Sequence, residues 1–134
     1  MKDKDRELSI YRLELAKETL ANARLCIDNY FYRDAVNRSY YAAFYAVRSV
    51  LAIEGIDFKR HKDVMAHFNK TYVATGIFPR ELGRKLGRMQ MMREDSDYSD
   101  FFTASREDAE NQYATAEMTI SSVENYLKRK HQCV

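Results

Sequence analysis

The stretch SYYAAFYAVRSVLAI, residues 39–53, decides the fold. Alanine, valine, leucine, isoleucine, phenylalanine and tyrosine fill most of its positions, so a helix made from it is apolar on nearly every face. Such a helix lies at the centre of a protein and is contacted from several sides. We expect it to run from Tyr32 to Ile53 and to end near Gly55, because glycine often terminates helices.

The segment that precedes it, Arg6–Asp28, has apolar residues at steps of three and four, which is the spacing of one helical face. This apolar face consists of Leu13, Ala16, Leu20, Ala23 and Ile27. After the central segment we expect a short helix over His61–Ala74. A fourth helix starts at Pro79, since proline fits the first turn of a helix. A last helix covers Ser105–Lys130.

No segment alternates apolar and polar residues as a strand would, and no internal repeat is present. The expected fold is therefore all-α: an up-down antiparallel helical bundle of four main helices plus one short helix. Short connections favour antiparallel neighbours. The length of 134 residues suits a single domain over residues 1–134.

The composition limits the classes of function. Hydrophobic residues make up 46% and charged residues 31%, and 22 Lys and Arg against 20 Asp and Glu leave a net charge of only +2. Nucleic-acid binding would therefore need a local basic patch. No secretory signal and no apolar run of membrane-spanning length are found. Cys26 and Cys133 lack metal-type spacing, so we expect two free thiols in a reducing cytoplasm.

Polar residues are rare in the central helix, and those present fall on one side. At about 100° per residue they form a polar and aromatic strip of Asn37, Arg38, Tyr41, Tyr45 and Arg48. The two arginines could bridge to acids on the first or last helix, or extend to water. Alternatively, the strip is a surface for a phosphate, a nucleotide or another protein chain.

A second polar group precedes the third helix. The sequence RHKD, Arg60–Asp63, places cations and a histidine at a helix N-terminus, where an anion binds favourably. His61 and Lys62 are thus candidate ligand-binding residues, with a solvated loop as the alternative. His61 and His67 are six apart and face different sides of a helix, so we expect no metal site and no cofactor.

The acidic stretch MMREDSDYSDFF, residues 91–102, follows the fourth helix. Arg93 continues the inward face of that helix, where an unpaired charge is costly. We expect Arg93 to be shielded from solvent and hydrogen-bonded to a carboxylate, with Asp97 preferred over Asp95. Asp95 or Ser96 could end the helix. The Tyr98 ring should pack beside Arg93, and Phe101 and Phe102 should anchor the chain. A mobile, solvated turn is the alternative.

Three motifs together resemble a known family. The sequences AVNRSYYAAFYAVRSVLA (35–52), HKDV (61–64) and REDSDY (93–98) are similar to those of the HEPN domain, in its small stand-alone prokaryotic branch. The resemblance covers about residues 8 to 130. It implies a helical bundle that dimerises, and many such proteins are encoded beside a small nucleotidyltransferase as toxin–antitoxin-like pairs.

The resemblance also implies a candidate site. Active members are metal-independent ribonucleases in which an arginine precedes a histidine by four to six residues. Arg93 matches that arginine, but the histidine position falls at or near Tyr98, and a phenol with a pKa of about 10 is a poor base at neutral pH. Whether the chain is an enzyme is thus left open.

The resulting hypothesis is a module that binds a nucleotide, RNA or a partner protein through a groove. The candidate groove residues are Arg38, Tyr41, Arg48, His61, Lys62, Arg93, Asp97 and Tyr98. The alternatives are a ribonuclease toxin, for which His61 could approach from another segment, and a homodimeric scaffold.

Aromatic content predicts the oligomeric state. Ten tyrosines and seven phenylalanines exceed what one core of this size needs, and such residues are enriched in interface cores. We expect a two-fold homodimer with residues 32–53 or the Arg93–Phe102 segment near the axis.

Overall fold

The computed structural model describes residues 2–132, and the described part of the chain is helical throughout, without a strand. The helices are α1 (Asp3–Asp28), α2 (Tyr32–Ile53), α3 (His61–Phe68), α4 (Arg80–Tyr98) and α5 (Arg106–Gln132), with a π-helical turn over Asn69–Val73 directly after α3. The predicted all-α class is confirmed, and α2 has the predicted bounds. Cys133 lies outside the described residues, whereas Cys26 is free and half-buried.

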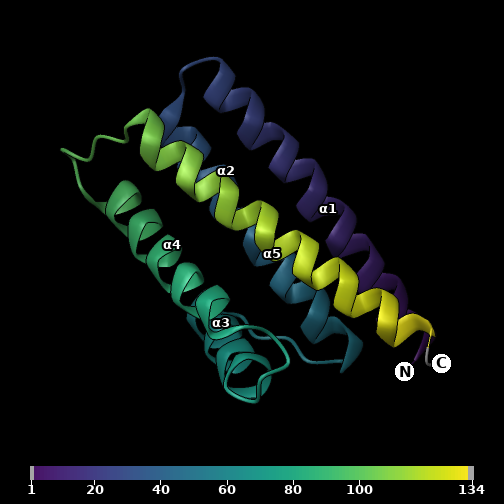
Figure 1. Cartoon of the computed structure of the whole chain (residues 1–134). Helices are drawn as coiled ribbons and strands as arrows, with labels where there is room; N and C mark the ends of the chain where they lie inside the picture. The colour runs from purple at the N-terminus through teal and green to yellow at the C-terminus, as the bar shows by residue number, and fades with distance from the viewer. Residues whose placement is uncertain (1, 133–134) are drawn as a thin grey trace.

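The helices form an up-down bundle around α2. Figure 1 shows α1, α2 and α5 running alongside one another, with α4 beside them, α3 across one end, and the two chain ends close together. Helix α2 contacts α1, α3, α4 and α5, as the prediction of a central helix requires. None of the described helices is long and apolar enough to cross a membrane.

Burial of α2 explains why its sequence decides the fold. Tyr40, Val47 and Val50 are fully buried, and Leu51 is 1% exposed. Each such side chain contributes roughly 1.5–3 kcal/mol by leaving water. The core around them is completed by Phe68 from α3, by Leu82, Leu86 and Met89 from α4, and by Val123 and Leu127 from α5. The apolar surface of α2 is thereby covered within one chain.

Glycine ends α2 as predicted. Glu54 follows the last helical residue, and Gly55 then adopts a positive φ of 70°, which residues with a Cβ rarely do. The Gly55 N–H donates a hydrogen bond to the carbonyl of Ala52 at 3.0 Å. This turn starts the 54–60 loop, which returns the chain to α3 beside α2.

Helix α4 is longer at its C-terminal end than expected. It continues to Tyr98, so Asp95 and the buried Ser96 lie inside the helix and do not end it. Because Tyr98 is five helical residues after Arg93, it points about 140° away from Arg93. The prediction of a packed Tyr98 ring is wrong: Tyr98 is 80% exposed. Phe101 is no anchor either, with 94% exposure, whereas Phe102 is half-buried.

Two glycines inside α4 give a matched prediction. A Cβ at Gly83 would lie 2.9 Å from Cγ1 of Val73, whereas a Cβ at Gly87 would meet no atom within 4 Å. Glycine in a helix interior costs about 1 kcal/mol relative to alanine. Gly87→Ala should therefore raise the free energy of unfolding by about 1 kcal/mol, and Gly83→Ala should lower it through overpacking. Urea denaturation of both variants checks this; a shift in the same direction for both would contradict it.

Candidate functional site

Arg93 of α4 lies against two tyrosines of α2. Its guanidinium carbon is 5.2 Å from the ring centre of Tyr40 and 5.5 Å from that of Tyr41, within the range of cation–π attraction. The Nη2 atom of Arg93 donates a hydrogen bond to the Tyr41 hydroxyl at 3.0 Å. These contacts orient the guanidinium and keep it between α4 and α2.

The predicted carboxylate partner of Arg93 is present. Nε of Arg93 lies 3.1 Å from Oδ2 of Asp97, and the Arg93 side chain is 18% exposed. The contact is an ion pair and lacks the angle of a hydrogen bond, since the buried Nε has no hydrogen-bond partner. Burial alone would lower the pKa of Arg93, but Tyr41, Asp97 and Tyr40 raise it, so the group stays charged. Among the described residues, Nη1 forms no hydrogen bond.

His61, the first residue of α3, meets the same tyrosines from another side. Its ring stacks on Phe44 with 4.0 Å between centres, and Nδ1 is hydrogen-bonded to the Tyr40 hydroxyl at 3.2 Å. Burial lowers the pKa of His61, and the charges of Arg93 and Arg48 lower it further. The imidazole is therefore neutral at pH 7. We call Tyr40, Tyr41, Phe44 and His61 the aromatic cluster.

Asp57, in the loop after α2, holds two arginines. Its carboxylate accepts hydrogen bonds from Nη2 of Arg48 at 2.9 and 3.0 Å, and from Nη2 of Arg12 at 3.2 Å. Arg12 also donates to the main-chain carbonyl of Arg48. Burial would raise the pKa of Asp57, but Arg48, Arg12 and the Phe58 N–H lower it below its ordinary value. Asp57 therefore fixes the position of Arg48.

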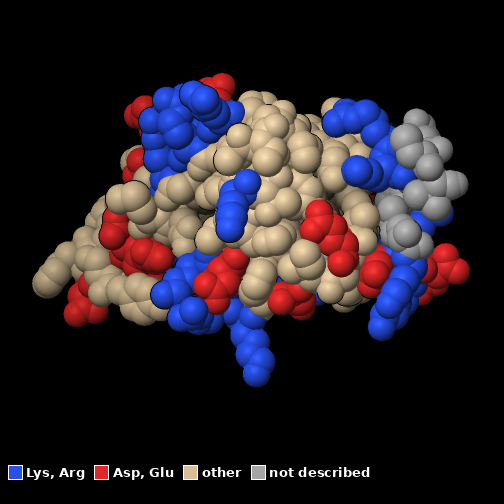
Figure 2. Space-filling model, turned by 90° about the horizontal axis from the view of Figure 1, so that it is seen from below, with Lys and Arg blue, Asp and Glu red and all other residues tan. Residues whose placement is uncertain are grey.

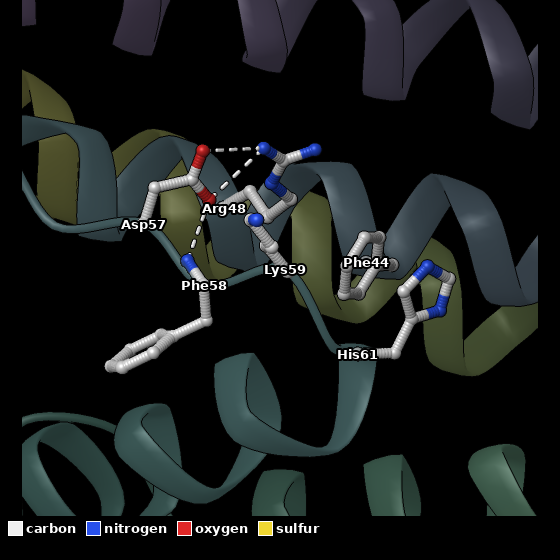
Figure 3. Close-up of a pocket in the computed structure, with 6 residues that line it drawn as sticks. All are labelled: Phe44, Arg48, Asp57, Phe58, Lys59 and His61. Atoms are coloured by element: carbon white, nitrogen blue, oxygen red, sulfur yellow. Dashed lines mark hydrogen bonds and ion pairs between the residues drawn. The ribbon is translucent and has the colours of Figure 1, made fainter.

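A hollow of about 290 Å³ opens between this ion-paired group and His61. Figure 3 shows the Arg48–Asp57 pair at one end, Phe44 in the middle and His61 at the other end. The hollow is lined by Phe44, Arg48, Asp57, Phe58, Lys59 and His61. It thus combines two cationic side chains, an imidazole and aromatic surface.

The structure brings together only some of the predicted groove residues. Arg48 and His61 line the hollow, and Tyr41, Arg93 and Asp97 meet beside the aromatic cluster. The expected single groove is therefore wrong; the cluster connects two separate parts. Outside both parts lie the exposed side chains of Arg38, Lys62 and Tyr98.

Sequence reasoning missed the loop residues of the hollow and Arg12. Asp57, Phe58 and Lys59 belong to an irregular loop whose path no periodicity predicts. Arg12 is 8% exposed and lies next to Leu13 in α1, so a cation bordering the predicted apolar face could have indicated a buried ion pair. Within the described residues, no three His, Cys, Asp or Glu side chains are close enough to hold a metal ion.

The arrangement of charged Arg93 and neutral His61 around a tyrosine pair can now be compared with known proteins. The family model described as "HEPN domain" matches residues 10–126. The chain belongs to the HEPN family. The suspected resemblance is confirmed, although no histidine follows Arg93 within six residues.

Relatives and a solved structure agree with this HEPN assignment. A UPF0332 protein of Thermotoga maritima is 33% identical over 96% of this chain and 96% of its own length. A Methanocaldococcus jannaschii protein, named as a candidate toxin, is 31% identical over 87% of this chain and 86% of its own. The crystal structure of an archaeal HEPN homologue matches the fold with a TM-score of 0.72 and 18% identity, covering 95% of this chain and 99% of that one.

The neutral His61 predicts a pH dependence of stability. Its folded-state pKa is below the ordinary 6.5, so below about pH 6.5 the unfolded chain binds a proton that the folded chain resists. The free energy of unfolding should therefore decrease as the pH falls from 6.5 toward the folded pKa, and His61→Gln should remove this part of the decrease. Urea denaturation between about pH 5 and 8 measures it. Parallel curves for the two proteins would contradict the prediction.

Proposed function

We propose that this HEPN protein binds RNA, with one nucleotide held in the hollow beside His61, as the binding component of a toxin–antitoxin-like system. A volume of about 290 Å³ is close to the lower end of ordinary ligand sites. Phe44 and Phe58 offer aromatic surface to a base, and Lys59 and Arg48 offer positive charge to a phosphate. The observation that carries the proposal is the meeting of these two chemistries with a neutral imidazole in one hollow.

Arg93 supplies a second phosphate contact in this proposal. It lies on the other side of the aromatic cluster, and its charge is felt by His61. Arginine suits a phosphodiester because its planar guanidinium can donate to two oxygens at once. A chain of two or three nucleotides would reach from the hollow to Arg93 across Tyr41.

The test is the binding of a fluorescent, single-stranded RNA oligonucleotide in EDTA, followed by anisotropy. Phe58→Ala removes the stacking surface, and such contacts contribute about 1–3 kcal/mol per base, so affinity should fall by roughly five- to 100-fold. Lys59→Gln should weaken binding and reduce its salt dependence. Phe101→Ala is the matched control, since Phe101 is exposed far from the hollow. Equal affinity for wild type and Phe58→Ala would reject the site.

RNA cleavage without a metal is the second candidate, and the neutral His61 favours it. With its Nδ1 proton donated to Tyr40, Nε2 could accept the proton of a ribose 2′-hydroxyl as that oxygen attacks the phosphorus and the 5′-oxygen leaves. Arg93 would stabilise the added negative charge. Products ending in a cyclic phosphate, absent with His61→Ala and with Arg93→Ala, would establish this activity and displace the pure binding role. Intact RNA after long incubation would reject it.

We also propose a two-fold homodimer through the end of the bundle where α1 meets α2 and α4 leads to α5. This end carries exposed aromatic residues: Tyr30, Phe31, Tyr98 and Phe101. In Figure 1 both connections lie at the same end, and Arg33 donates a hydrogen bond to the carbonyl of Ser96 there. The covered surface of α2 favours this end over α2 as the axis. Light scattering that gives a 15.8 kDa particle would contradict the dimer.

A cytoplasmic location and a protein partner belong to the same proposal. A relative named as a candidate toxin supports a paired system, in which a small nucleotidyltransferase is the expected partner. Co-purification from the native organism, followed by mass spectrometry, tests for this partner.

A further inference from the structure

A second basic surface lies on the outer face of α4, away from the site described above. Arg80, Arg84 and Arg88 are exposed and recur every four residues, about 6 Å apart along the helix. Arg84 is nine residues before Arg93, so the two point to opposite sides of α4. Figure 2 shows Lys and Arg side chains gathered over α4. We call these three arginines the outer ridge.

The cations of the outer ridge are available to a ligand. Lys85 beside them pairs with Glu81 at 3.5 Å, whereas none of the three arginines forms an ion pair within the described residues. The chain as a whole has a net charge of only +2, so a row of three unpaired arginines is a local feature and not a consequence of overall charge.

Hollows flank the outer ridge on both sides, and each contains an amide oxygen without a partner. One, of about 320 Å³, lies between α4 and α5 with Arg88 at its rim and Gln112 in its lining. Gln112 is 8% exposed, and its Oε1 has no hydrogen-bond donor. The other, of about 650 Å³, is lined by Arg80, Arg84 and Asn69, whose buried Oδ1 also lacks a donor. Unpaired buried oxygens cost about 1–3 kcal/mol, so a ligand N–H or O–H would be favourable there.

Gly87 adds a further feature of the surface. It lies between Arg84 and Arg88, and no heavy atom lies within 4 Å of the place where a Cβ would be. Packing inside the chain therefore does not require a glycine, although glycine weakens the helix. Its absent side chain leaves a flat strip of main chain between the arginines.

We propose that the outer ridge binds the sugar–phosphate backbone of single-stranded RNA, with 2′-hydroxyl or base N–H groups donating to Gln112 and Asn69. RNA supplies anions in a row and, next to each one, hydrogen-bond donors. An acidic peptide supplies carboxylates, which are acceptors only and would leave the two amide oxygens unpaired. The ridge also lacks the large apolar centre of protein interfaces. This surface is independent of the hollow beside His61, and it would bind RNA even if that hollow bound none.

The test compares two variants of the full chain with equal charge. Arg80→Gln/Arg84→Gln/Arg88→Gln removes the ridge, and Lys4→Gln/Arg6→Gln/Lys128→Gln removes three exposed cations elsewhere. Anisotropy with a labelled single-stranded RNA should show at least about tenfold weaker binding for the ridge variant. The slope of log K against log salt should fall by about 2, because each phosphate contact on a single strand contributes about 0.7. The control variant should lose much less.

Two further arms identify the ligand. Gln112→Leu should reduce the preference for RNA over DNA of the same sequence, because the 2′-hydroxyl then loses its acceptor. Circular dichroism verifies that each variant is folded. The proposal is overturned by wild-type RNA affinity in the ridge variant, by equal losses in both triple variants, or by ridge-dependent binding of polyglutamate in preference to RNA. Phe58→Ala measured alongside separates failure at the hollow from failure at the ridge.

Discussion

Asp57→Ala should lower the free energy of unfolding by about 2 kcal/mol. The Arg12 side chain is 10% exposed and depends on Asp57 for its neutralising charge, while Arg48 is a second cation beside it. Removing the partner of a buried charge costs 3–5 kcal/mol, and the 51% exposure of Asp57 reduces that value through solvent screening. Chemical denaturation of both proteins at pH 7 measures the difference.

A double-mutant cycle identifies the cause. Arg12→Met in the Asp57→Ala background removes the uncompensated charge and keeps most of the side-chain volume, so it should restore much of the lost stability. The pKa of Asp57 is below its ordinary 3.8 in the folded chain, so the stabilisation is complete above about pH 4 and is lost as the pH falls through the folded pKa. Strictly additive effects of the two substitutions would contradict the buried ion pair.

The helices were predictable from sequence because their periodicity is local. A residue such as Tyr40 could be placed in the core from the apolar surroundings in its own helix, and α2 begins and ends where the pattern indicates. Arg93 was placed correctly for the same reason, since it continues the spacing of Leu86 and Met89. The pairing with Asp97 then follows, because residues four apart on a helix are neighbours.

The remainder of the site depends on distances that no local pattern encodes. Asp57 meets Arg12 across 45 positions of sequence, and His61 reaches Tyr40 because the 54–60 loop folds back along α2. Tyr98 was misplaced for a local reason: three carboxylates after Arg93 were expected to end the helix, yet α4 continues and turns Tyr98 to the opposite side. A single helical turn thus decides whether a side chain belongs to the site.

Arg93→Ala should weaken RNA binding by about tenfold, equivalent to about 1.4 kcal/mol. A hydrogen bond to a charged group contributes about 1.5–3 kcal/mol, and partial exposure of Arg93 places the expected loss at the lower end. Arg93→Lys should fall between wild type and Arg93→Ala, because an ammonium keeps the charge but lacks the planar fork. Anisotropy with the same RNA measures all three, with Arg106→Ala as an exposed control on α5.

The same variants separate a positioning role of Arg93 from direct contact. Tyr41→Phe keeps the ring under the guanidinium and removes only the oxygen that accepts the Nη2 hydrogen bond. If Arg93 contacts phosphate directly, Arg93→Ala should reduce the salt slope by about 0.7, whereas Tyr41→Phe should lower affinity and leave the slope unchanged. An unchanged slope in folded Arg93→Ala would mean that Arg93 only supports the aromatic cluster, and the phosphate contact would have to come from Lys59 and Arg48 at the hollow.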